Sequence, residues 1–126
     1  MKKLLILLFS LIISLNSYGE WIKVGTNNEG RTYYVDNDTI KEHGAHVYFW
    51  MLTDYLKPWK GYMSDQTYLQ VNCKILRYKP LTATIYKGQM GKGDNKSPPP
   101  PPDEWIYTQP NTIGYSIVTE VCDKVN

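Results

Sequence analysis

Apolar and polar residues alternate most regularly in the middle of the chain. The segment 67–78 predicts a half-buried antiparallel strand that points Cys73 into the core. The apolar positions on its inner face are Leu69, Val71, Cys73 and Ile75. The alternation resumes after Pro80, over residues 81–86, and predicts a second strand that pairs with the first as a hairpin.

Shorter segments rich in aromatic and β-branched residues precede this hairpin. Residues 21–24 and 32–35 predict two short strands, because each is followed by a turn rich in glycine, asparagine or aspartate. Residues 47–52 are apolar on both faces and predict a central strand. The segment 54–59 contains Pro58 and is expected to form a loop.

The last part of the chain has helical periodicity. Apolar residues recur every four positions over residues 113–125, which predicts a helix capped by Asn111 or Thr112. The preceding Pro98–Pro102 run cannot form a central strand, so a stiff exposed loop or a docking segment is expected there. Together these elements predict an α+β fold: an antiparallel β-sheet of about five or six strands with a C-terminal α-helix packed on it.

The first 19 residues have the pattern of a secretory signal peptide. Two lysines precede an apolar run from Leu4 to Leu15, and small residues stand at positions −3 and −1 of a cut after Gly19. The run would span about 18 Å as a helix, well short of a hydrocarbon core of roughly 30 Å. We therefore expect a signal peptide over residues 1–19, one domain over residues 20–126, and no membrane span after cleavage.

Length and charge narrow the classes of function. A chain of 126 residues is one small domain, which excludes a multidomain enzyme. Loss of the two signal-peptide lysines leaves 12 of the 14 basic residues against 12 acidic ones. A neutral mature chain has no general attraction to nucleic acid, so a nucleic-acid partner is not expected.

Cys73 and Cys122 are the two cysteines of the chain. Export to an oxidising compartment favours a disulfide between them, which would join the central strands to the closing helix. The alternatives at this point are two free thiols or a metal-binding pair. A disulfide across a loop of this length would stabilise the fold by about 4 kcal/mol in the loop-entropy model.

The sequence contains no convincing catalytic, metal or cofactor motif. His43 and His46 supply two imidazoles without a third ligand at characteristic spacing, so turn histidines are favoured over a metal site. The glycines of residues 88–93 do not have nucleotide-binding spacing and favour a hairpin end. Asp36 and Asp38 are expected to bond the backbone of a turn.

Three aromatic residues stand out in the predicted loop region. Tyr55, Trp59 and Tyr62 lie beside Lys57 and Lys60, and exposed aromatic rings next to cations are good contact anchors. They form the candidate partner-binding loop. The alternative is that these rings pack over the edge of the sheet.

The order of several short motifs resembles the surface-adhesin protein E family of exported bacterial proteins. These motifs are Trp21-x-x-Val24, Tyr34-x-Asp36, Ile40, the Val47–Trp50 strand, Leu52-x-Asp54-Tyr55, Ser64, Cys73, Tyr86-x-Gly88-x-Met90-Gly91-x-Gly93, Trp105, Pro110-x-Thr112 and Val121-Cys122. The resemblance implies an antiparallel sheet with a helix packed on it. It also implies a surface or periplasmic module, with binding of host extracellular matrix known for some members.

The leading hypothesis is an exported, non-catalytic binding module at the bacterial surface or in the periplasm. Its partner would be a host matrix protein or an envelope component held by exposed loops. The alternatives are a structural or accessory periplasmic envelope protein and, more weakly, a small secreted hydrolase or inhibitor. A paired edge strand could also give a homodimer.

Overall fold

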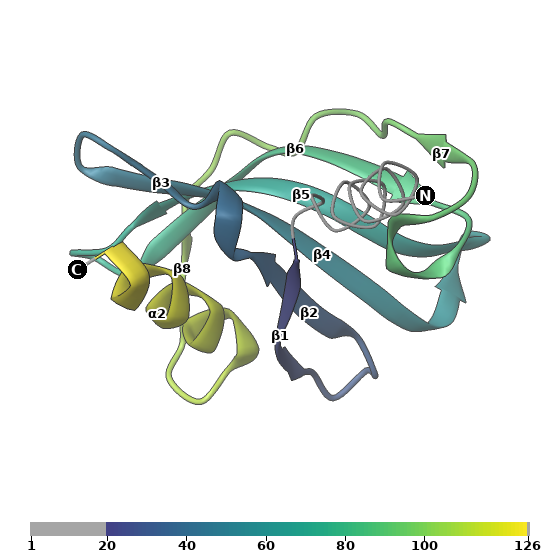
Figure 1. The fold of residues 1–126 in the computed structure, drawn as a ribbon, viewed down its shortest axis with the longest axis horizontal. Helices are drawn as coiled ribbons and strands as arrows, with labels where there is room; N and C mark the ends of the chain where they lie inside the picture. The colour runs from purple at the N-terminus through teal and green to yellow at the C-terminus, as the bar shows by residue number, and fades with distance from the viewer. Residues whose placement is uncertain (1–19, 126) are drawn as a thin grey trace, which may run out of the picture.

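An antiparallel sheet of eight strands forms the body of the computed structural model, which describes residues 20–125 (Figure 1). The predicted signal peptide, residues 1–19, lies outside the described residues. The strands are β1 (Trp21–Thr26), β2 (Thr32–Asp36), β3 (Lys41–His43), β4 (His46–Trp59), β5 (Tyr62–Asn72), β6 (Arg77–Tyr86), β7 (Asn95–Lys96) and β8 (Ile106–Tyr107). The helix is α2 (Ile113–Val125), and the 3₁₀ turns are η1 (Asn37–Thr39) and η2 (Gln89–Gly91). The α+β class is confirmed. The sheet has more strands than predicted, because β3, β7 and β8 are too short to show an alternating pattern in the sequence.

The two longest strands lie in the middle of the sheet. The strand order is β1-β2-β4-β5-β6-β7, with β3 paired to β4 and β8 paired to β6. The β4–β5 register sets Val47 opposite Val71 and Phe49 opposite Leu69 on the face that α2 covers. In Figure 1, α2 lies toward one end of the sheet and the β4–β5 turn toward the other.

Helix α2 has a polar cap and one apolar side, as predicted. Thr112 precedes its first residue, and the Thr112 Oγ1 atom accepts a hydrogen bond from the Tyr115 backbone N–H at 3.3 Å. This bond satisfies one of the free donors at the start of the helix. The helix residues buried against the sheet are Ile117, Val118, Val121 and Cys122.

The predicted disulfide joins Cys73 to Cys122, with 5.8 Å between the two Cα atoms. The predicted strand over residues 67–78 is wrong in its second half, because β5 ends at Asn72. The Asn72 Oδ1 atom accepts hydrogen bonds from the backbone N–H groups of Lys74 and Ile75, and these bonds turn the chain. Cys73 therefore lies in a turn, and Ile75 is 52% exposed instead of facing the core.

The predicted loop over residues 54–59 is also wrong, because β4 continues through Pro58 to Trp59. The β4–β5 register shifts between Asp54 and Trp59. The missing N–H of Pro58 therefore breaks no regular ladder bond. Lys60 and Gly61 close the hairpin, both with positive φ, as a tight two-residue turn requires.

The proline run follows the outer edge of β6. Strand β7 pairs with Ile85 and Tyr86, β8 pairs with Arg77 and Tyr78, and the prolines connect these two short pairings. Within the run, Pro98 and Pro101 are half-buried and the other three prolines are exposed. This spacing matches the three residues per turn of a polyproline II helix. A segment without N–H donors beside an edge strand also disfavours pairing with another chain at that edge.

The disulfide closes a loop with a sequence separation of 49 residues, and its removal should lower stability strongly. We expect the double variant Cys73→Ser/Cys122→Ser to lose about 4 kcal/mol of unfolding free energy, mainly because its unfolded chain gains freedom. Urea unfolding of the two proteins measures this difference. An unchanged unfolding midpoint would contradict it.

Candidate functional site

The end of the β4–β5 hairpin carries exposed apolar and aromatic side chains. We call residues 56–62 the hairpin tip. Leu56 is 68% exposed and Trp59 is 42% exposed. Trp59 lies opposite Tyr62 across the hairpin. The ammonium nitrogen of Lys60 lies 4.8 Å from the Trp59 ring centroid, and that of Lys87 lies 4.6 Å from the Tyr62 ring centroid.

Tyr55 does not share this exposure. Its side chain is 5% exposed, and its hydroxyl donates a hydrogen bond to the Asp65 carboxylate. The guanidinium of Arg31 lies 4.8 Å from the centre of its ring. The expectation that Tyr55 is an exposed loop residue is therefore wrong. Trp59 lies at the tip and is exposed, whereas Tyr62 opposite it is half-buried and meets the expectation of exposure only in part.

A groove of about 310 Å³ nevertheless connects Tyr55 with Trp59. It is lined by Arg31, Tyr55, Trp59, Asp65, Thr67, Ala83, Ile85 and Pro98. Asp65 and Thr67 precede Leu69 on β5 at two-residue steps, so they share the face of the sheet that α2 covers farther along. The groove therefore continues the core face beyond the helix, toward the hairpin tip.

Asp65 is the carboxylate at the base of this groove. It accepts hydrogen bonds from the Tyr55 hydroxyl and from the Thr67 hydroxyl, the latter at 3.1 Å. Burial raises the pKa of Asp65, and this effect outweighs the hydrogen bonds and the positive charge of Arg31. Burial and the bond to Asp65 in turn raise the pKa of Tyr55. The Arg31 side chain has its own counter-ion, because its Nε lies 4.0 Å from a Glu29 carboxylate oxygen.

The sequence pattern did not place four residues in this region, namely Asp65, Arg31, Lys87 and Pro98. The sequence did contain a sign of Asp65. It lies an even number of residues from Leu69 on the alternating strand, so it faces inward, where a charged residue is unusual. The other three residues come from different parts of the chain. Only the fold brings them to the groove or the tip.

Burial of Asp65 predicts a pH-dependent stability with a definite sign. Its pKa in the folded state lies above the ordinary value of 3.8, so the folded protein holds the proton more tightly than the unfolded chain. The contribution of Asp65 to stability is therefore fully present below that ordinary value and is lost as the pH rises through the folded pKa. Asp65→Asn should remove this part of the slope in urea unfolding measured from about pH 4 to about pH 7.

The exposed carboxylate Asp94 offers a matched control for this measurement. Asp94→Asn should keep the pH slope of the wild-type protein. Equal slopes for wild type and Asp65→Asn would show that Asp65 is not responsible.

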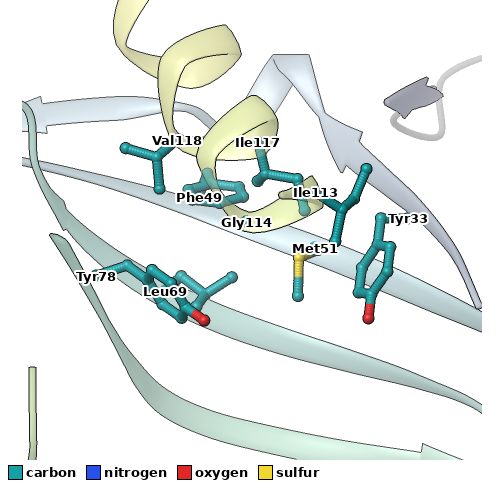
Figure 2. Close-up of a pocket in the computed structure, with 9 residues that line it drawn as sticks. All are labelled: Tyr33, Phe49, Met51, Leu69, Tyr78, Ile113, Gly114, Ile117 and Val118. Carbon is teal, nitrogen blue, oxygen red and sulfur yellow. The ribbon is translucent and has the colours of Figure 1, made fainter. Parts of the chain in front are cut away.

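A second hollow lies between α2 and the sheet (Figure 2). This cavity has a volume of about 120 Å³ and is lined by Tyr33, Phe49, Met51, Leu69, Tyr78, Ile113, Gly114, Ile117 and Val118. Figure 2 shows the helix side chains pointing toward those of the strands, with Tyr33 and Tyr78 carrying the only hydroxyls among the labelled residues. Burial raises the pKa of both hydroxyls, so both stay protonated and neutral near pH 7. The cavity is a packing hollow without a pair of groups for acid–base chemistry.

Gly114 lines this cavity in the first turn of α2, and a methyl group fits there. A Cβ built at Gly114 meets its nearest neighbours, in Thr112 and Tyr78, at 3.9 Å or more. Gly114→Ala should raise the unfolding free energy by about 0.5–1 kcal/mol, because alanine loses less conformational freedom in a helix. Thermal unfolding measures the gain. A lower melting temperature would show that this turn of the helix has no room for the methyl group.

The remaining sequence candidates have structural roles. His43 and His46 face each other across the β3–β4 hairpin. The His46 ring stacks on the Trp105 ring, with 5.5 Å between the two ring centroids. In residues 20–125 no three histidine, cysteine, aspartate or glutamate side chains are grouped as a metal site. Asp36 caps η1 by accepting the backbone N–H of Asp38 at 3.1 Å.

The glycine-rich segment after β6 is a packed turn and does not form a phosphate loop. The buried Ser64 hydroxyl donates to the Gly88 carbonyl at 2.6 Å and accepts the Gly91 backbone N–H at 2.9 Å. The Met90 backbone N–H donates to Asp54 at 2.9 Å. The N–H groups of Met90 and Gly91 are thus already bonded within the protein, as the hairpin-end interpretation expects.

Comparison with known proteins agrees with this fold. The chain belongs to the surface-adhesin protein E family, because the model of that family matches residues 21–123. A search of curated proteins found no match. Membership places the chain among adhesin-like proteins that are exported or at the cell surface, a class of binding proteins.

Solved structures of Haemophilus influenzae protein E have the same fold. Crystal form II of that protein is 19% identical, with a TM-score of 0.67 over 86% of this chain and 91% of that chain. Another structure of it has a TM-score of 0.65 at 19% identity, over 86% and 87% of the two chains. Protein E from non-typeable Haemophilus influenzae gives 0.61 at 19% identity, over 86% and 78%. Within the described part of the chain, no helix has the length and apolar character needed to cross a membrane.

Proposed function

We propose that this chain is an exported, non-catalytic binding module that holds a protein partner at the hairpin tip and the adjoining groove. The observation that carries this proposal is the exposure of Leu56 and Trp59 at the end of the longest hairpin. Large exposed apolar side chains at a protruding edge are typical of a contact surface, and aromatic rings are the residues most often found as binding anchors. Membership in an adhesin family supports the same role.

The hairpin presents these anchors in a fixed geometry. The tight turn at Lys60 and Gly61 sets Trp59 opposite Tyr62. Below the tip, the bond between Tyr55 and Asp65 ties β4 to β5 where their regular pairing shifts. A contact surface that is ordered before binding loses less conformational entropy when the partner arrives.

The proposed partner is a host extracellular-matrix protein, in keeping with the adhesin class. The protein would reach the surface through the signal peptide proposed for residues 1–19, with cleavage after Gly19. An envelope component is the other protein partner to test. The groove offers a carboxylate and a tyrosine hydroxyl bonded to each other, and a partner side chain can enter beside them.

Binding of the purified exported protein to immobilised matrix proteins tests the proposal. Trp59→Ala/Tyr62→Ala should weaken binding by about tenfold or more, because a buried aromatic anchor contributes at least roughly 1.4 kcal/mol. Tyr107→Ala is a matched control, since Tyr107 is 59% exposed and lies on β8, away from the hairpin tip. Circular dichroism confirms that the variants remain folded.

Two outcomes would overturn this assignment. If the double variant binds as tightly as wild type, the hairpin tip is not the contact surface. If the protein binds envelope extract and no matrix protein, the host-matrix role is replaced by an accessory role in the envelope.

A further inference from the structure

Three exposed lysines surround the hairpin tip. Lys57 lies on β4, Lys60 lies in the turn, and Lys87 follows the end of β6. The Lys87 ammonium lies over Tyr62 and only 3.6 Å from the position of a Cβ built at Gly61. Within residues 20–125 the ion pairs are made by Arg31, Lys79 and Lys124, so none of the three tip lysines has a carboxylate within ion-pair distance.

Two carboxylates near the tip have partners, one is buried, and one exposed carboxylate, Asp94, lies opposite Lys87 in the turn after β6. Asp54 accepts the Met90 backbone N–H, and Glu29 lies beside Arg31. Asp65 is buried with a raised pKa, so its negative charge is disfavoured. Three lysines against the one exposed carboxylate of Asp94 give the tip a local excess of positive charge, although residues 20–125 carry 12 basic and 12 acidic side chains.

We propose that the partner presents an acidic segment carrying apolar side chains to the hairpin tip, an inference that rests on the binding role proposed above. Carboxylates of this segment pair with Lys60 and Lys87. Its apolar side chains cover Leu56 and Trp59.

The lysines are suited to carboxylates on a flexible segment. Two of them rest on aromatic rings, which holds their ammonium groups near the surface. A lysine is a point charge with rotatable donors, so it attracts carboxylates without requiring the planar fork geometry of arginine. This attraction is long-range and weakens with salt.

The apolar residues decide between an acidic protein segment and a sulfated polysaccharide. A polysaccharide would neutralise the lysines, but it would bring no apolar group to cover Leu56, whose side chain is 68% exposed. An acidic peptide with leucine-like side chains satisfies both features. The exposed apolar area beside the lysines therefore favours the protein segment.

Fluorescence anisotropy with a labelled peptide of alternating glutamate and leucine tests the proposal on the full exported protein. We expect binding that weakens about tenfold or more between roughly 50 mM and 500 mM NaCl. The same peptide with glutamine in place of glutamate should bind at least about tenfold more weakly, and so should the peptide with serine in place of leucine.

A charge-matched pair of variants locates the site. Lys60→Glu/Lys87→Glu should weaken peptide binding by about tenfold or more, through lost attraction and added repulsion. Lys41→Glu/Lys74→Glu changes the net charge equally on exposed residues at the other end of β4 and β5, about 40 Å away by strand length. This control should bind the peptide as wild type does.

The outcomes separate this inference from the proposed function. Equal binding by the two lysine variants, or binding of heparin but not of the acidic peptide, overturns the acidic-segment proposal. If the peptide does not bind while Trp59→Ala/Tyr62→Ala still abolishes binding of a matrix protein, the hairpin tip remains the proposed binding site. Only the acidic character of the partner segment is then rejected. If that aromatic variant retains matrix binding, the proposed function itself falls.

Discussion

The long antiparallel ladder between β4 and β5 is the constraint on which the rest of the molecule depends. Its register places Phe49 opposite Leu69 and Thr53 opposite Asp65 on one face. Because side chains alternate strictly along a strand, that face carries both the core under α2 and the groove beyond it. A slip of one residue would turn this face to solvent and would remove the helix-packing surface and the groove together.

The two ends of this ladder are held by different interactions. At one end the disulfide of Cys73 ties the turn after β5 to α2, and the core residues gather there. At the other end the helix is absent, and a buried carboxylate bonded to Tyr55 takes the inward position. Burial of a charged carboxylate opposes folding. The groove end of the ladder is therefore less stable because of Asp65, whereas the disulfide and the core stabilise the end under α2. Local departures from good packing are expected where a protein has a functional surface.

Sequence patterns predicted the elements whose periodicity extends over many residues. The four-residue repeat of α2 and the alternation around Leu69 and Val71 are of this kind. The errors came from single residues with two possible roles. Pro58 normally ends a strand, but here the shifted register leaves its missing N–H without consequence. Asn72 lies within an alternating run, and only its side-chain bonds show that the strand stops there.

The proposed binding surface can be seen in the sequence only in part. Trp59 and its lysine neighbour are adjacent in the chain, so their pairing is visible in the sequence. Lys87 reaches Tyr62 only because β6 runs beside β5. The net charge gives no sign of this contact either. A balanced total over residues 20–125 does not show where on the molecule the charges lie. The positive charge at the tip arises because strand pairing gathers three lysines there. Asp65 is buried, Asp54 and Glu29 have partners, and the exposed Asp94 offsets only one of the lysines. A chain whose charges balance over residues 20–125 therefore presents a charged surface only where its topology gathers like charges.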